Sequence, residues 1–229
     1  REIIGNVVIT QAGATITCDR AIQFLDDDNA ELTGNVILVQ DTTIVRTPKA
    51  YYYGSTKTTY SVSGVQLIDG KVTLESDSGY YHLDKRIARF RGNVKLYDLI
   101  NNLESDSLIY YRDLRKAEAA GRVKLRDTGS VMFADSLVHF QDAGDTYAFK
   151  NIVIKNFTNN TLITGNYLED FRKQARRFIT GEPLLVKIDT LEDGRYDTLF
   201  IEAKEMYATG DSADVIIANR DNKDLFDVK

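Results

Sequence analysis

A pair of aliphatic residues returns every 29 residues along most of the chain. The first member is valine or isoleucine, and the second, two residues later, is isoleucine or leucine. Because residues i and i+2 of a β-strand share a face, each pair marks an apolar strand face. The two rows are Val7, Val36, Val65, Val94, Val123 and Ile152, and Ile9, Leu38, Leu67, Leu96, Leu125 and Ile154. Six units in constant register predict a repeat protein whose units stack to cover each other's apolar faces.

Turn-forming residues stand directly before the aliphatic pair. Gly5-Asn6, Gly34-Asn35 and Gly92-Asn93 each precede a valine. Glycine and asparagine tolerate positive φ, so we expect a tight turn or a β-bulge where each of these strands begins.

A second strand in each unit surrounds a row of aspartates, twelve residues after the valines. The row consists of Asp19, Asp77, Asp106 and Asp135, with Pro48 and Thr164 in two units. Apolar residues at odd spacings from this row are the first choice for the buried face: Ile22, Phe24, Tyr80, Ile109, Tyr111, Val138 and Phe140. Apolar residues at even spacings, such as Tyr81 and Leu108, would then face outward. A bulge at the aspartate row would reverse these faces, and a strand that is apolar on both faces near its end is the other possibility. The sequence leaves both open.

The composition favours strands throughout. The chain is 43% hydrophobic and contains two prolines, and its Val, Ile, Thr and Tyr residues are spread evenly. Residues 167–178 could form a helix, but they fit two charged strands and a turn at least as well. The predicted fold class is all-β, as a repeat-built antiparallel β-jelly roll or, alternatively, a parallel β-helix. Stacked aspartates about 4.8 Å apart would repel one another in a β-helix, although stacked asparagines would suit it. The jelly roll is therefore favoured.

The repeat is regular over residues 3–155 and gives way to longer, divergent units over residues 156–229. Pro183 occupies the valine position of a seventh unit, where proline indicates a strand edge or a bulge. We expect residues 1–229 to form a single elongated domain that belongs to a longer array of repeats.

The residue content disfavours several classes of function. A net charge of −5 and a pI near 5.2 argue against a nucleic-acid partner. No apolar run approaches the ~20 residues that a membrane-spanning helix needs. His82 and His139 fall in aromatic rows and Cys18 falls in a row of small residues, so we expect all three to fill packing positions. Without a convergent set of acid, base, nucleophile or metal ligands, we expect no enzyme activity, no cofactor and no metal.

The repeat is similar to that of the LptA/OstA family. Its pattern is G-N-V-x-L, then I-x-(A/S)-D-x-(L/A)-x-Y, then A-x-x-x-G-N-V. It is matched by residues 92–96, 103–110 and 117–123, and in part by residues 16–19 and 30–36. The resemblance implies the OstA-like jelly roll of the periplasmic bridge for lipopolysaccharide export, which is also the N-terminal domain of the translocon subunit LptD. It implies a periplasmic location in a Gram-negative bacterium, as a free protein or as the soluble part of an outer-membrane protein.

The resemblance further implies a lipid carrier without catalysis. Each methylene transferred from water is worth ~0.8 kcal/mol, so an apolar trough would shield acyl chains while the headgroup stays hydrated. The candidate lining residues are the two aliphatic rows and the seven residues at odd spacings from the aspartate row. The implied partners are lipopolysaccharide or a related lipid, other OstA-like domains docking end to end on open edge strands, and the outer membrane indirectly. The alternative is a structural or adhesive β-solenoid with a dry, packed core.

Overall fold

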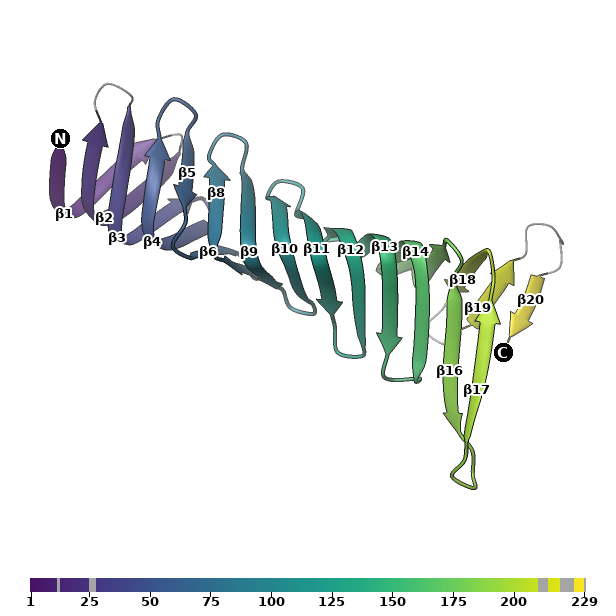
Figure 1. Ribbon diagram of the computed structural model, residues 1–229. Coiled ribbons are helices and arrows are strands. Elements are labelled where there is room, and N and C mark those ends of the chain that lie inside the picture. The colour runs from purple at the N-terminus through teal and green to yellow at the C-terminus, as the bar shows by residue number, and fades with distance from the viewer. Residues whose placement is uncertain (12, 25–27, 210–213, 219–224, 229) are drawn as a thin grey trace. The chain divides into compact units, whose positions relative to one another are not determined.

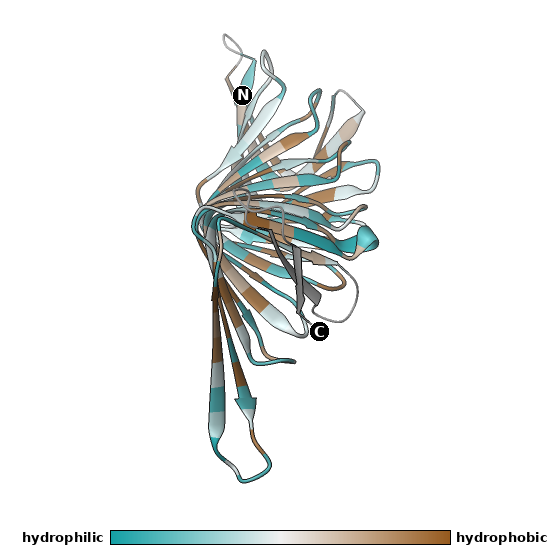
Figure 2. Ribbon diagram, turned by 90° about the vertical axis from the view of Figure 1, so that its right-hand side faces the viewer, coloured by the Kyte–Doolittle hydropathy of each residue, from teal (hydrophilic) through white to brown (hydrophobic). Residues whose placement is uncertain are grey.

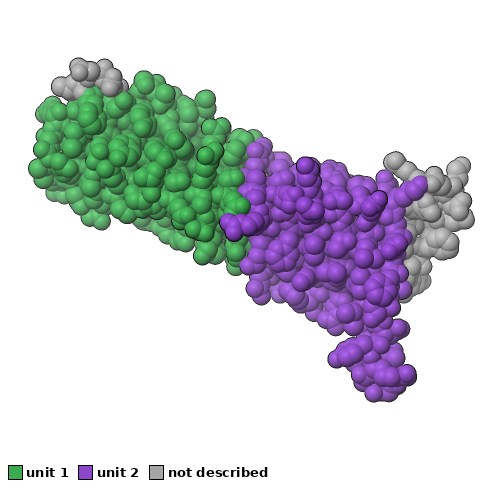
Figure 3. All heavy atoms as spheres, viewed as in Figure 1, with its two compact units in different colours: residues 1–114 green, residues 115–229 purple. Residues whose placement is uncertain are grey.

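The computed structural model describes residues 1–11, 13–24, 28–209, 214–218 and 225–228. The chain is all-β, as predicted, with about 75% of the described residues in strands (Figure 1). It divides into two compact units, residues 1–114 and residues 115–229 (Figure 3). Each unit is described by itself, and the single domain expected over residues 1–229 stays a prediction.

The described residues of unit 1 form ten strands, and the pairings among these strands are antiparallel. The strands are β1 (Glu2–Gln11), β2 (Ala14–Phe24), β3 (Asn29–Gln40), β4 (Thr43–Tyr53), β5 (Thr58–Ser61), β6 (Val65–Asp69), β7 (Val72–Ser76), β8 (Ser78–His82), β9 (Ile87–Tyr97) and β10 (Asn102–Tyr111). Most strands pair with their sequence neighbours. Near the middle, β4 pairs with both β5 and β6, and β9 pairs with both β7 and β8, so the short strands form two halves of longer ones.

Unit 2 is also built of antiparallel strands. They are β11 (Lys116–Arg126), β12 (Ser130–Phe140), β13 (Asp145–Asn156), β14 (Thr161–Phe171), β15 (Arg176–Thr180), β16 (Leu184–Thr190), β17 (Tyr196–Glu202), β18 (Glu205–Thr209), β19 (Asp214–Ala218) and β20 (Leu225–Val228). Residues 167–178 are two strands joined by a short 3-10 turn, Arg172–Gln174. Pro183 lies in the break between β15 and β16, which both pair with β14. Since the pairings in this unit are antiparallel as well, the parallel β-helix alternative is wrong.

A bulge bends the long strands near their middle. In β3 the pairing with β4 shifts between Thr33 and Val36, where Gly34 and Asn35 have φ of 77° and 45°. A Cβ on Gly34 would lie 2.4 Å from Asp19 Oδ2, and the side-chain amide of Asn35 donates to the same oxygen at 2.9 Å. Glycine is thus required for both its φ and its lack of a side chain. The predicted bulge is confirmed, but it lies inside a continuous strand rather than at a strand start.

The aspartate row therefore has a structural role in several repeats. Asp77 accepts a hydrogen bond from Asn93 at 2.8 Å, and Asp135 accepts one from Asn151 at 2.9 Å. Each hydrogen bond joins one strand to the bulge of the next strand, so the bends of neighbouring strands stay aligned.

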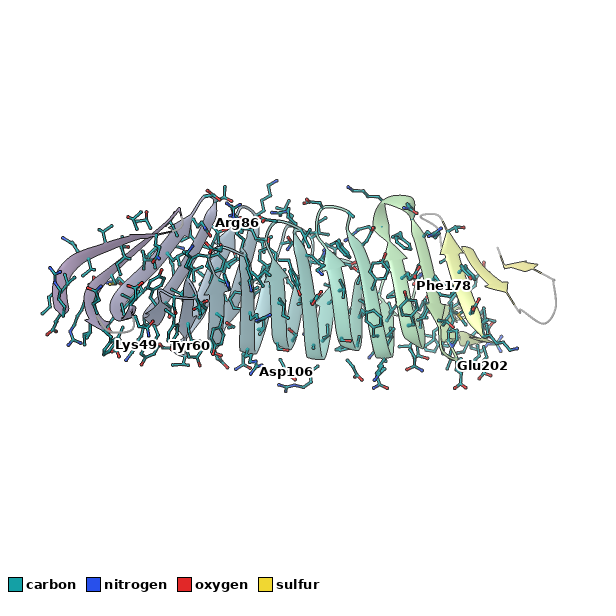
Figure 4. All side chains as sticks on the ribbon, turned by 90° about the horizontal axis from the view of Figure 1, so that it is seen from above. Lys49, Tyr60, Arg86, Asp106, Phe178 and Glu202 are labelled. Carbon is teal, nitrogen blue, oxygen red and sulfur yellow. The ribbon has the colours of Figure 1, made fainter. Side chains whose placement is uncertain are left out.

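The bends give each unit two walls that meet along one edge (Figure 2). We call the wall that carries the aliphatic pairs the aliphatic wall, and the other the tyrosine wall, since it carries Tyr52, Tyr81 and Tyr110. The bend edge joins the walls covalently through the bulges. At the opposite edge, the open edge, the hairpin turns of both walls lie. In unit 1 Lys49 and Tyr60 lie toward the bend edge, on the margin opposite Arg86, which lies at a hairpin turn (Figure 4).

Candidate functional site

The apolar interior between the walls is the candidate site in each unit. The valine row is buried throughout, with Val94, Val123 and Ile152 each 1% exposed. In the second row Leu38, Leu67, Leu96 and Ile154 are buried, whereas Ile9 and Leu125 are half-buried. Val7, Val36 and Val65 are buried as well. Within each unit, the structure thus places that unit's members of the two predicted aliphatic rows on the inner face of the aliphatic wall.

The predicted inner face of the tyrosine wall is wrong. Residues at even spacings from the aspartates face inward: Tyr81, Leu108, Tyr110 and Leu137 are 1–3% exposed. Residues at odd spacings lie on the outer face. Phe24 and Tyr80 are exposed by 49% and 46%, and Ile22, Ile109, Tyr111, Val138 and Phe140 are half-buried. The physical reason is the bulge: the extra residue reverses the alternation of side chains, so counting in steps of two across the aspartate row places every later residue on the wrong face.

A periodic signal could have located this inner row. Residues 14 and 16 positions after each valine include Ala50 with Tyr52, Leu108 with Tyr110, and Leu137 with His139. These positions also repeat every 29 residues, although Gln23, Gly79 and Asn166 interrupt the apolar pattern. Treating the strand as two segments separated by a bulge would have put both rows inside.

The interior is closed and packed in this structure. Leu32, Leu74 and Ala88 are fully buried, and one cavity in unit 1, lined by residues that include Val45 and Phe90, measures about 20 Å³. That volume suits about one water molecule and no acyl chain. The sequence predicted an unfilled trough between the walls. In this structure the side chains of the walls fill that space.

The reactive side chains are part of this packing. Cys18 is buried at the aliphatic wall, and burial raises the pKa of its thiol. His139 is buried in the same row as Tyr81 and Tyr110, with Nδ1 2.9 Å from the Thr146 hydroxyl. In the part of the chain that the structure describes, no group of three or more His, Cys, Asp or Glu side chains could hold a metal ion. Nor does any helix within those residues have the length and apolar character to cross a membrane.

The fold and interior define a repeat-built, antiparallel β-jelly roll in which two walls enclose apolar side chains. Residues 1–60 match the family described as OstA-like protein, which confirms the predicted resemblance for that stretch. This is a family of non-catalytic transport bridges, in agreement with the prediction that the chain is not an enzyme.

One similar solved structure is the crystal structure of LptH, the LptA homologous periplasmic component of the conserved lipopolysaccharide transport device from Pseudomonas aeruginosa. It is 12% identical, with a TM-score of 0.46, over 49% of this chain and 93% of LptH. A comparison with curated proteins gives no match.

Proposed function

We propose that the chain is a periplasmic component of lipopolysaccharide transport that shelters acyl chains between its two walls. The observation that carries the proposal is the buried aliphatic face, repeated in register in a chain whose first 60 residues are OstA-like. Such a face matches saturated hydrocarbon in polarity. Shielding of this kind needs no side-chain chemistry, and the direction of transport must come from an energised partner.

A packed interior accepts an acyl chain only if the walls separate. Separation exposes the aliphatic rows, but the entering chain covers them again, so the main costs are bending at the bulges and broken contacts between the walls. The chain itself gains ~0.8 kcal/mol per methylene removed from water, which is about 8 kcal/mol for ten methylenes. This gain exceeds the cost of several hydrogen bonds of about 1 kcal/mol each. The closed structure is then the empty state of the carrier.

The proposal includes docking of other OstA-like domains on edge strands. Within the described residues, β1 pairs only with β2, and its Ile4 and Val8 side chains are 74% and 62% exposed. A strand added along this edge would satisfy its backbone groups and cover these residues. The double variant Ile4→Lys/Val8→Lys should sediment as a monomer at concentrations where the unchanged chain associates. Equal association of both proteins would contradict docking at β1.

Site-specific photocrosslinking tests lipid binding. Leu96 is 2% exposed, and its neighbour Lys95 lies on the outer face of the same strand. A photoreactive amino acid at Leu96, or at the half-buried Leu125, should capture lipopolysaccharide, whereas one at Lys95 should not. Capture at Lys95 but at neither inner position would refute the proposal.

The packed interior also favours one other function, a structural or adhesive β-solenoid with a dry core. That function predicts no capture at Leu96, Leu125 or Lys95. It also predicts that acylated ligands leave the stability of the chain unchanged.

A further inference from the structure

The open edge of unit 1 is closed by a row of tyrosines that reach from one wall to the other. Tyr81 donates to Gln40 Oε1 at 2.8 Å, and Tyr110 donates to Asp69 Oδ2 at 3.1 Å. Tyr52 bonds to Gln11 Oε1 in the same way. Each donor lies on the tyrosine wall, and each acceptor lies 41 residues earlier on the aliphatic wall. Donors and acceptors both recur every 29 residues, so the closure is a property of the repeat.

These polar groups are buried at the boundary of an apolar interior. Tyr52, Tyr81 and Tyr110 are 4%, 3% and 1% exposed, and Gln40 and Asp69 are 4% and 3% exposed. Burial raises the pKa of Tyr52 and of Tyr81, so both hydroxyls keep their protons at neutral pH and can donate. Because buried polar groups need hydrogen-bond partners, these side chains stabilise contact between the two walls as long as no other molecule supplies a partner.

Charged side chains reinforce the closure at the hairpin turns. Arg112 donates to Asp41 Oδ2 at 3.0 Å and to the Thr42 hydroxyl at 3.2 Å. Arg86 lies 2.8 Å from the same oxygen of Asp41. Both arginines belong to hairpins of the tyrosine wall, and Asp41 belongs to the β3–β4 turn of the aliphatic wall. The side chain of Arg112 is only 11% exposed, whereas that of Asp41 is 51% exposed, so the contact is shielded from solvent on the arginine side alone.

The two edges of the unit differ in how they can open. At the bend edge the backbone itself joins the walls, and the aspartate–asparagine bonds hold neighbouring bulges. At the open edge the row consists of hydrogen bonds made by side chains, which include a bond from Gln40 Nε2 to the backbone oxygen of Leu83 at 3.4 Å. Each such bond contributes little net stability, and it breaks without any loss of strand pairing. The interior can therefore widen most easily at the tyrosine row.

We propose that the tyrosine row, Tyr52, Tyr81 and Tyr110, is the lateral entrance of the interior and the binding subsite for the polar junction of an acylated amphiphile. This inference rests on the proposed function. An amphiphile whose chains lie among the aliphatic rows must place its ester or amide groups and hydroxyls where the apolar surface ends, which is at this row. Tyrosine hydroxyls and glutamine amides then exchange their bonds to the opposite wall for bonds to these groups. In the empty state the same side chains close the entrance.

The first measurement follows the width of the open edge without any lipid. Lys71 and Lys85 are exposed in hairpin turns of opposite walls, and cysteines at both positions in a Cys18→Ala background can carry spin labels. The unchanged tyrosine row should give one short distance by double electron–electron resonance. The variant Tyr81→Phe/Tyr110→Phe, which lacks only two hydroxyls, should add a population at longer distance. Tyr53→Phe, which removes an outer-face hydroxyl next to Tyr52, is the matched control and should leave the distance unchanged.

The second measurement follows the binding of a fluorescent dodecanoyl amide. Each lost hydroxyl should raise the association rate about fivefold, as expected for one hydrogen bond of ordinary strength in the closed state. The dissociation rate should rise too, because the bond to the amide is lost as well. Adding the amide to the spin-labelled protein should lengthen the distance between the labels.

The outcomes separate the inference from the proposed function. Binding of the amide with distances and rates equal to those of Tyr53→Phe would overturn the inference and leave the proposed function standing. A widened edge in the double variant with no binding by any protein would refute the proposed function and the junction subsite, and support the closing role of the row alone.

Discussion

The bulge at Gly34 is the feature whose replacement tests the fold most sharply. In Gly34→Ala, the new methyl group would lie 2.4 Å from Asp19 Oδ2 and 2.9 Å from Asp19 Cβ, closer than real side chains approach. Asp19 must move, which breaks its hydrogen bond with Asn35 and shifts the neighbouring strand. Gly64 has a similar φ, +82° against +77°, but a methyl group there meets nothing within 4 Å. Gly64→Ala is therefore a matched control for the backbone strain.

Both variants share the cost of an alanine at positive φ, about 1–2 kcal/mol. The loss of the exposed Asp19–Asn35 bond and the strand shift add about 1–2 kcal/mol to Gly34→Ala alone. For a chain of this length, that excess corresponds to a melting temperature about 2–8 °C below that of Gly64→Ala. Thermal unfolding followed by circular dichroism measures the difference. Equal melting temperatures for the two variants would show that close approach to Asp19 does not shape the bend.

Three further predictions concern single side chains. Leu67→Ala should lower the free energy of unfolding by about 2–5 kcal/mol, since Leu67 is 1% exposed. Val39→Ala, on the outer face, should lower it by less than about 1 kcal/mol. Equal losses in urea titrations would contradict the assignment of faces. The hydrogen bond from Tyr167 to Glu169 raises the pKa of Tyr167 to about 12, so its stabilising effect should be complete below pH 10 and be lost as the pH rises toward 12. Tyr167→Phe should remove an ionisation step near pH 12 from an absorbance titration, and an unchanged titration would argue against the bond. Burial of Cys18 predicts that maleimide modifies it far more slowly in the folded chain than in urea, and similar rates would show that the interior is not closed.

The sequence was most informative where the structure repeats. The spacing of Val94 and Leu96 from their equivalents fixed a strand face without any tertiary information, because two-residue periodicity and stacking of equal units are both local rules. The aspartate row argued correctly for antiparallel strands. The sequence did not reveal that these aspartates accept hydrogen bonds from bulge asparagines such as Asn35, because that contact joins residues 16 apart on different strands.

The tyrosine wall shows why the remaining lining residues could not be assigned by counting alone. A bulge between Ser105 and Ser107 moves Leu108 and Tyr110 inward and Ile109 outward, and all three are apolar enough to be buried. Hydrophobicity cannot choose between two such faces. The closed state of the interior was equally beyond the sequence, because it depends on bonds between walls, such as that of Tyr81 to Gln40, that join separate repeats.

The central claim, that acyl chains enter between the walls, is tested most directly by nuclear magnetic resonance with a fatty acid that carries a spin label on its chain. The spin label broadens the signals of nearby methyl groups, and Leu38 and Val39 are adjacent residues on opposite faces of β3, 2% and 39% exposed. The account predicts stronger broadening of the methyl signals of Leu38 and Leu96 than of those of Val39. Stronger broadening of Val39 than of Leu38 and Leu96, or broadening of none of the three, would contradict it.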